Sequence, residues 1–259
     1  MMNYIRPMAK IRLWITSFLI ILLFFPVLAQ AQVELISAER MPVDARYDST
    51  ANKEMQAVMD SYRAKMEKEI SRHIGTCAQD MASHAPESLL SNFLADQLLE
   101  KARELTAGSG DFSVLNFGGI RAPINKGDIT VGDIYRVMPF ENELVILKLK
   151  GSDVSSIFEH MAMEGGEAIS NATLEIKNKQ VESLMIGGVP LDEGKFYFVA
   201  TMDYLADGNS GMEAFLNAVE RIDTHLRVRD VYIEQIEKLT SQGKVVDAGL
   251  DGRIKIINQ

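Results

Sequence analysis

A short strand that runs into two adjacent glycines constrains this chain most. The apolar run Phe112–Leu115 is typical of a buried strand. Gly118 and Gly119 follow, and because glycine has no Cβ, the backbone there can bend sharply or approach a ligand closely. Asn116 and Arg121 flank the pair with an amide and a guanidinium suited to phosphate or carboxylate. Taken alone, the segment favours an ordinary turn with a surface arginine over a ligand loop.

Further segments reverse that preference. Asn116-Phe-Gly-Gly-Ile-Arg121 resembles the Asn-x-Gly-Gly-Ile-Arg signature of the C-terminal domain of 5'-nucleotidases, a family that includes UDP-sugar hydrolases and 2',3'-cyclic phosphodiesterases. The resemblance covers the chain from about Tyr47 to the C-terminus. It continues, in the family's order, through Gly127–Thr130, Val137–Phe140, Lys148–Gly151, Tyr197–Ala200, Tyr204–Gly208 and Gly252–Ile254. It implies a single α+β domain with a mixed sheet and flanking helices, preceded by a long linker helix.

Residues 1–31 are typical of a secretory signal peptide. A basic start precedes the apolar run Leu13–Leu28 and the small-x-small motif Ala29-Gln30-Ala31. The run is short for a membrane span, which needs about 20 residues, so a retained anchor is the less favoured alternative. We expect cleavage after Ala31, export to the periplasm or the cell exterior, and no stable membrane anchor afterwards.

The charge balance restricts the partners. The chain has 27 basic and 36 acidic residues and a net charge of −9; residues 1–31 hold three basic and no acidic residues, so the mature chain carries −12. This acidity argues against nucleic-acid polymers as partners. An anionic nucleotide would need local positive charge, which gives weight to Arg121. Cys77 is the single cysteine, and a buried small apolar residue is its favoured role.

We expect three parts: the signal peptide over 1–31, an N-terminal arm with a long amphipathic helix over 32–75, and a substrate-binding domain over 76–259. Within the arm, alternation favours a strand over 32–41, and Asp48–Thr50 offer an N-cap for the helix. One face of that helix carries an apolar stripe, whose expected role is packing. The stripe consists of Met55, Met59, Tyr62, Met66 and Ile70.

Periodicity, caps and turn residues predict the elements of the domain. Helices are expected from Pro86–Glu87 to Gly108, over 130–137, over 154–161, over 212–220 and over 230–242. Strands are expected over 112–115, 144–149, 195–201 and 253–257, with a hairpin formed by 172–177 and 181–186. This mixture of strands and helices also favours an α+β domain with a mixed sheet.

The sequence contains no recognisable catalytic machinery. Two-metal hydrolysis needs about six or more oxygen and nitrogen ligands, which the resemblance assigns to His, Asp and Asn clusters of a separate N-terminal domain. Here His73, His84, His160 and His225 are scattered, and no Ser or Cys is paired in sequence with a base. We expect no cofactor in this chain, and divalent metals only in a partner metallophosphatase.

The resemblance instead implies a nucleotide- or nucleoside-binding site. Asn116 and Arg121, around Gly118 and Gly119, would hold the phosphate and ribose. Phe140 and Tyr204 would stack on the base, each contributing roughly 1–3 kcal/mol. The alternative for both rings is ordinary core packing.

Two departures from the family pattern leave the substrate open. Ser210 occupies the position where relatives usually have an aspartate that binds ribose hydroxyls. No arginine lies between Arg72 and Arg103, where relatives place one or two, and His84 is close to the expected position. Both Ser210 and His84 are therefore candidate site residues.

Three functions remain open at this stage. The first is an exported specificity subunit of a 5'-nucleotidase-type phosphohydrolase, acting in nucleotide catabolism with a separate metallophosphatase chain. The second is a non-enzymatic nucleoside-binding module. The third is a structural or interaction protein that kept the fold and lost the site.

Overall fold

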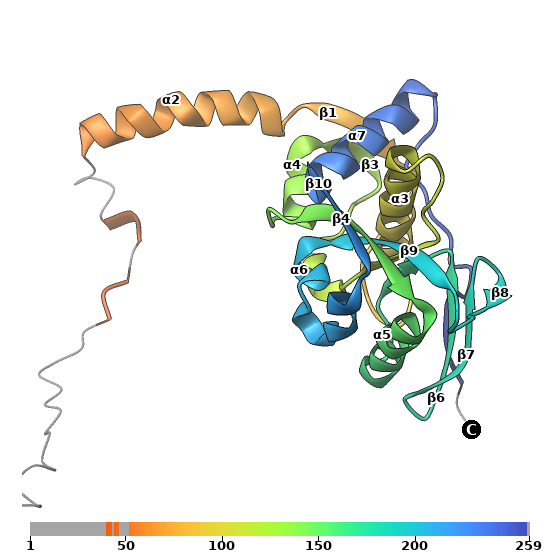
Figure 1. The fold of residues 1–259 in the computed structure, drawn as a ribbon. Coiled ribbons are helices and arrows are strands. Elements are labelled where there is room, and N and C mark those ends of the chain that lie inside the picture. The colour runs from red at the N-terminus through yellow and green to blue at the C-terminus, as the bar shows by residue number, and fades with distance from the viewer. Residues whose placement is uncertain (1–39, 43, 47–51, 258–259) are drawn as a thin grey trace, which may run out of the picture. The chain divides into compact units, whose positions relative to one another are not determined.

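The computed structural model describes residues 40–42, 44–46 and 52–257 (Figure 1). The chain divides into two compact units, 1–56 and 57–259, and the boundary falls inside helix α2 (Lys53–Ile70). The predicted signal peptide, the predicted N-cap residues Asp48–Thr50 and nearly all of the strand expected over 32–41 lie outside the described residues. Among the described residues, no helix combines the length and the apolar character that crossing a membrane requires.

Helix α2 is the predicted long helix, but its apolar stripe is not packed. Asn52 caps it, because its Oδ1 accepts the backbone N–H groups of Glu54 and Met55 at 2.9 and 3.2 Å. Every residue of α2 is exposed, including the stripe from Met55 to Ile70. The prediction that this stripe packs is therefore wrong for the described residues. Periodicity places side chains on one face of a helix and carries no information about what covers that face.

A five-stranded mixed sheet forms the centre of the second unit (Figure 1). Its order is β10 (Glu220–Arg227), β4 (Glu143–Lys150), β9 (Phe196–Met202), β2 (Phe112–Leu115) and β5 (Ala168–Ser170). Neighbouring strands are antiparallel, except that β2 and β9 are parallel. Four consecutive residues of β4, Leu144–Leu147, are buried, as predicted for a strand covered on both faces.

Helices α3 (Leu89–Leu105) and α5 (Gly151–Glu164) cover opposite faces of this sheet. Ser113 of β2 donates its hydroxyl to the Ala95 carbonyl of α3 at 2.8 Å. The preceding residue, Phe112, packs its ring against Phe158 of α5, with centroids 5.6 Å apart. Because consecutive strand residues point to opposite faces, these two contacts place α3 and α5 on different sides. Helix α7 (Val228–Ser241) packs against α3.

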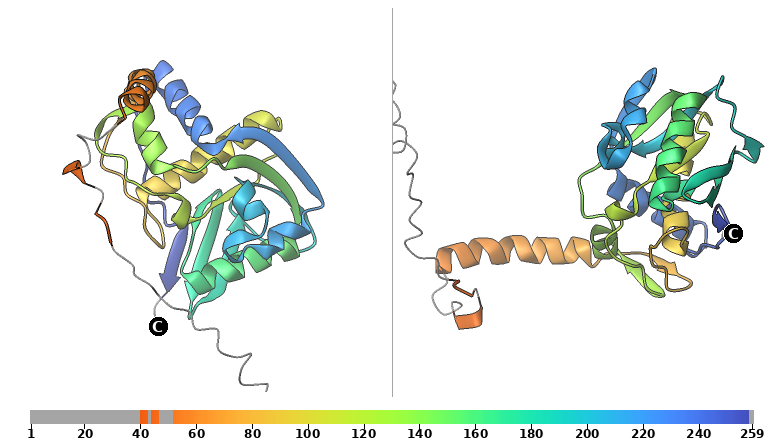
Figure 2. Two further views of the ribbon diagram at one scale, coloured as in Figure 1. Left: turned by 90° about the vertical axis from the view of Figure 1, so that its left-hand side faces the viewer. Right: turned by 90° about the horizontal axis from the view of Figure 1, so that it is seen from below.

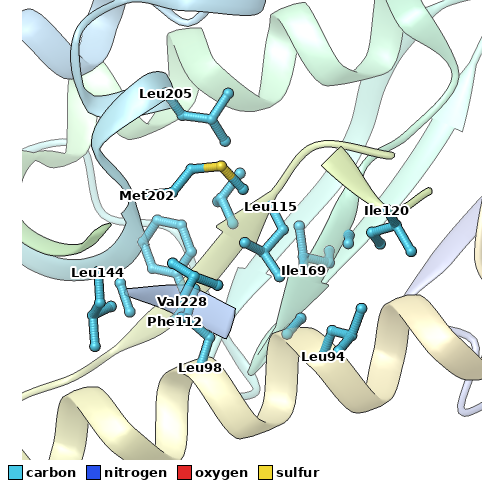
Figure 3. Close-up of a cluster of buried hydrophobic side chains, with 14 of the residues drawn as sticks. Leu94, Leu98, Phe112, Leu115, Ile120, Leu144, Ile169, Met202, Leu205 and Val228 are labelled. Atoms are coloured by element: carbon cyan, nitrogen blue, oxygen red, sulfur yellow. The ribbon is translucent and has the colours of Figure 1, made fainter. Parts of the chain in front are cut away.

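The core between α3 and the sheet extends toward the carboxyl ends of β2 and β9 (Figure 3). Leu94 and Leu98 of α3 lie near Leu115 and Ile169 of the sheet. Met202, the last residue of β9, belongs to the same buried cluster. The strand ends that follow are therefore anchored in packed side chains, which favours a well-defined geometry for whatever they support.

Two smaller sheets complete the fold. One contains β11 (Ile254–Ile257), β6 (Ala172–Lys177), β7 (Gln180–Ile186) and β8 (Val189–Pro190), and it confirms the predicted hairpin. Figure 2 shows the C-terminal β11 lying beside β6, with which it pairs in parallel. The other pairs β1 (His73–Cys77) with β3 (Gly127–Thr130), and Cys77 is buried as expected. The predicted capping box of Thr130 and Asp133 starts α4 (Val131–Val137).

Two element predictions are wrong. The helix expected over 212–220 is a 3₁₀ turn, η4 (Glu213–Asn217), followed by strand β10. Pairing with β4 extends the chain from Glu220 onward, so tertiary context overrides a helix-favouring composition. Pro86 and Glu87 also precede α3 rather than opening it, because Ser88 is its N-cap in a capping box with Ser91.

Candidate functional site

Three segments far apart in sequence meet at one edge of the central sheet. The strands β2 and β9 are parallel neighbours, so their carboxyl ends lie at the same edge. The strand β4 is antiparallel to β9, with Leu144 opposite Met202, so its amino end lies there too. The turn after β2, the loop after β9 and the loop before β4 therefore converge.

The convergence encloses a cavity of about 660 Å³, within the range of small-molecule sites. Six of the eight predicted site residues line it. The lining consists of the predicted Asn116, Gly118, Gly119, Phe140, Tyr204 and Ser210 together with Glu141, Asn142 and Met202. Sequence reasoning missed the last three, since their place at the sheet edge follows from strand pairing rather than from a local pattern.

Arg121 and His84 do not line the cavity. Arg121 is exposed, and its Nη1 donates to the carbonyl of Gly118 at 3.3 Å, which holds the guanidinium beside the cavity's edge. His84 is exposed, with Nδ1 3.3 Å from the Ala85 carbonyl oxygen. The structure thus brings Arg121 close to the other predicted residues and leaves His84 outside the lining.

The two glycines make room for the Asn116 side chain. Gly118 and Gly119 belong to the 3₁₀ turn η2 (Phe117–Gly119) and have no positive φ. A Cβ on Gly119 would lie 3.0 Å from Asn116 Oδ1, and one on Gly118 would lie 3.3 Å from Nδ2. Glycine therefore suits these positions because the Asn116 side chain approaches the backbone closely, which is neither the sharp bend nor the ligand contact that the sequence suggested.

Asn116 presents a buried acceptor that has no partner. The residue is only 8% exposed, and its Oδ1 makes no hydrogen bond within the described part of the chain. Leaving such an atom desolvated and unpaired costs about 1–3 kcal/mol, and most buried polar groups avoid it. Because Asn116 lines the cavity, a ligand donor placed there would supply the missing hydrogen bond.

Two aromatic rings reach the cavity without being part of the core. Phe140 is 47% exposed and Tyr204 is 42% exposed. The alternative that these rings are ordinary core residues is therefore wrong. An exposed ring that lines a cavity offers a flat apolar face to a ligand.

Asp203 links the loops that carry these rings. It opens the short helix α6 (Asp203–Ala206), and its Oδ1 accepts Nδ2–H of Asn142 at 2.8 Å and the backbone N–H of Tyr204 at 2.7 Å. Phe140 and Asn142 lie on the same loop. The Asp203 carboxylate therefore sets the position of one aromatic loop relative to the other.

The loop after α6 carries Ser210 into the cavity. Asn209 Nδ2 donates to the Tyr204 carbonyl at 2.8 Å, and Ser210 Oγ donates to the Tyr204 hydroxyl at 3.5 Å. Ser210 lies in the 3₁₀ turn η3 (Asn209–Gly211) with a φ of 57°. A non-glycine residue held in this region is uncommon and marks a constrained backbone.

Glu141, the one carboxylate in the lining, is paired with two arginines that lie outside the lining. Arg229 Nη2 and Arg227 Nε each lie 2.7 Å from a different oxygen of Glu141. The hydrogen bond from Arg229 holds the pKa of Glu141 below its ordinary value. None of the lining residues is a cation, and Arg121 is the predicted positive group that contacts one of them, Gly118.

A second cavity, of about 690 Å³, lies between α3, α7 and the segment before β11. Its central cation, Arg253, is paired with Asp96 at 2.8 Å and Asp251 at 2.8 Å. Ser170 in turn donates to Asp96 at 2.6 Å. These polar groups satisfy one another, so we assign the ligand site to the cavity that contains the unpaired Asn116. Among the described residues, no group of three or more His, Cys, Asp or Glu is arranged to hold a metal ion.

Comparison with known proteins identifies the family. Residues 73–217, more than half of the chain, match the model of the 5'-nucleotidase C-terminal domain, and the chain belongs to this family. The predicted resemblance and the predicted α+β fold are both confirmed.

Similar proteins agree with this assignment. The trifunctional nucleotide phosphoesterase protein YfkN of Bacillus subtilis is 29% identical over 83% of this chain, and Protein UshA of Yersinia enterocolitica is 32% identical over 53%. The chain spans only 16% and 26% of these relatives. Among solved structures, a 5'-nucleotidase precursor from Thermus thermophilus is similar with a TM-score of 0.69 and 28% identity, over 79% of this chain and 43% of that chain.

Proposed function

We propose that the cavity binds the nucleoside part of a nucleotide. The observation that carries this proposal is the Asn116 Oδ1 acceptor, buried without a partner in a cavity that two exposed aromatic rings also line. A sugar hydroxyl or a base N–H would satisfy that acceptor. The faces of Phe140 and Tyr204 suit a planar base. Membership of a 5'-nucleotidase family supports a nucleotide as the source of both groups.

In this proposal the chain is an exported specificity subunit, and a separate metallophosphatase chain supplies the hydrolytic metals. The scattered histidines of the sequence support this division of labour, because a two-metal centre needs clustered ligands. The signal-peptide pattern of residues 1–31 supports export. The chain would hold the nucleoside and present the phosphate to its partner.

Calorimetry of the mature chain with adenosine, uridine and their 5'-monophosphates tests the binding proposal. We expect saturable binding of at least one nucleoside and a weakening of about five-fold or more in Asn116→Ala. Asn125→Ala is the matched control, because Asn125 is an exposed asparagine outside the cavity lining. Absence of binding of any of the four compounds at millimolar concentration would refute the proposal.

The partner is tested separately, by capturing proteins from a native extract with the tagged mature chain. We expect the captured fraction to release phosphate from AMP, to lose that activity with a chelator and to contain a second chain. We expect the purified chain to release none. Phosphate release that follows this chain alone through gel filtration would contradict the division of labour.

A second candidate is a non-enzymatic nucleoside-binding module. The absence of a cation from the cavity lining favours it, because a phosphate gains little from such surroundings. Equal affinity for adenosine and AMP, together with no captured phosphatase, would select this candidate.

A further inference from the structure

The segment from α5 to β5 supports two of the loops that form the cavity. Helix α5 begins directly after β4 and ends at Glu164, and its C-cap Gly165 has a left-handed conformation. His160 on α5 and Glu167 just after it both lie outside the cavity lining. Each is nevertheless bonded to the backbone of a loop that lines it, and the two loops are different ones.

His160 supports the loop that carries Ser210. Its Nε2 lies 3.0 Å from the Ser210 carbonyl oxygen. A carbonyl oxygen only accepts, so this nitrogen must carry the proton and donate. A Cβ built on Gly211 would lie 2.1 Å from the His160 ring, which shows that the ring fills the space against this loop. The contact therefore falls on a residue with an uncommon φ, since that of Ser210 is 57°.

Glu167 supports the turn that follows β2. Its Oε2 accepts the backbone N–H of Phe117 at 2.5 Å. Phe117 opens η2, and its N–H is one of the donors that a helical turn cannot satisfy internally. Burial raises the pKa of Glu167 to about 7, although the Phe117 N–H opposes this rise. A largely desolvated carboxylate is a costly way to fill space, so packing alone does not account for Glu167.

We propose that His160 and Glu167 are positioning residues that fix the Asn116 turn and the Ser210 loop relative to each other. Phe158 anchors α5, which carries His160, in the core against Phe112. Glu167 directly precedes β5, whose Ala168 pairs with Leu115 of β2. Through these two contacts, α5 and β5 set the separation between the buried amide oxygen of Asn116 and the hydroxyl of Ser210. The consequence for nucleoside affinity rests on the proposed function, whereas the positioning itself does not.

Five variants separate positioning from general packing. Glu167→Met and His160→Met keep much of the volume and remove the hydrogen bond. Glu167→Gln retains an oxygen acceptor, and His160→Gln retains an N–H donor near the position of Nε2. Glu159→Gln is the control, because Glu159 is exposed on α5 and lies outside the lining.

The first measurement is hydrogen exchange of the ligand-free proteins. We expect Glu167→Met to speed exchange at Phe117–Ile120 about ten-fold and His160→Met to do so at Ser210–Met212, while β4 and β9 keep their protection. The two Gln variants and the control should match wild type. Unchanged loop exchange in both Met variants would overturn the proposal, whether or not the protein binds nucleosides.

The second measurement is calorimetry with adenosine and uridine. We expect each Met variant to bind about 5- to 20-fold more weakly and each Gln variant to recover to within about three-fold of wild type. Failure of wild type to bind either compound would refute the proposed function, and hydrogen exchange would still decide the positioning proposal. Wild-type affinity in both Met variants would overturn the claim that positioning controls binding.

Discussion

The two cavities have nearly equal volumes, about 660 and 690 Å³, and differ in how their polar groups are satisfied. In the larger one, Arg253 is only 10% exposed, and its guanidinium bonds to Asp96, Asp251 and the Ile169 carbonyl. In the smaller one, Asn116 Oδ1 has no partner among the described residues. Volume therefore does not identify a ligand site here, whereas an incomplete hydrogen-bond network does. The cavity of Arg253 should govern stability, and the cavity of Asn116 should govern binding.

The largest expected effect is a loss of stability when the hydrogen-bond network of Arg253 is broken. Arg253→Met should lower the free energy of unfolding by about 3 kcal/mol, because the Ile169 carbonyl loses its guanidinium donor and the Asp96 carboxylate keeps only the Ser170 hydroxyl. Nucleoside affinity should stay within about two-fold of wild type. Urea denaturation and calorimetry measure the two quantities. Lys244→Met, at an exposed residue of the same cavity, is the control. A stable variant with weakened nucleoside binding would reverse the comparison.

The aromatic rings give the next largest effect, on affinity. Phe140→Ala and Tyr204→Ala should each weaken nucleoside binding by about 1–3 kcal/mol, or roughly 5- to 150-fold. The free energy of unfolding should change by less than about 1 kcal/mol, because both rings are exposed. Phe196→Ala is the matched control, since Phe196 is 50% exposed and lies outside the lining. Unchanged affinity in both variants would remove the rings from the binding site.

The pH dependence of stability tests the support behind the turn that carries Asn116. Burial raises the pKa of Glu167 from 4.5 to about 7, so the folded state disfavours its ionised form. The resulting stability is fully present below pH 4.5, declines as the pH rises above that value, and is lost once the pH has passed about 7. The nearby Glu164 carboxylate contributes to the shift.

Glu167→Gln should remove this pH-dependent loss, and urea denaturation at pH 5 and pH 8 measures it. The wild-type protein should lose more stability between these two values than the variant. Glu159→Gln should follow wild type, since Glu159 is exposed. Identical pH dependence in wild type and Glu167→Gln would show that Glu167 does not ionise in this range.

A smaller effect is expected from Arg121. Arg121→Met should weaken AMP binding about five-fold, or roughly 1 kcal/mol, and leave adenosine binding unchanged, because only AMP carries a phosphate for the guanidinium. Calorimetry with both ligands measures the difference. Arg136→Met is the control, because that exposed arginine pairs with Asp133 away from the lining. An equal loss for AMP and adenosine would argue against a phosphate contact.

The smallest effect is expected from His84, which is exposed and outside the lining. His84→Ala should weaken AMP binding by at most about two-fold and leave adenosine binding unchanged, because only AMP carries a phosphate for this side chain. Calorimetry with both ligands measures the difference. Equal AMP affinity in both proteins would exclude His84 from phosphate binding.

Local patterns predicted the elements whose causes are local. The capping box at Thr130, the buried run of β4 and the hairpin of β6 and β7 all depend on residues close in sequence, and all are confirmed. The short strands β1, β3 and β5 were not predicted, because they pair with partners distant in sequence. Long-range pairing also explains the wrong helix over 212–220. Because β10 pairs with β4, this segment forms a short 3₁₀ turn that leads into β10.

The sequence by itself determined the family resemblance, whose signature motif supplied three of the nine lining residues and whose other segments supplied three more. Only the tertiary structure decided how those residues act. The parallel pairing of β2 with β9 brings the Asn116 turn and the Tyr204 loop to one edge, and the antiparallel β4 adds Phe140. Only the folded chain buries Asn116 Oδ1 without a partner and places Glu167 and His160 behind the loops. The physical reason is that caps and periodicity act within a few turns of chain, whereas burial and convergence depend on contacts between distant segments.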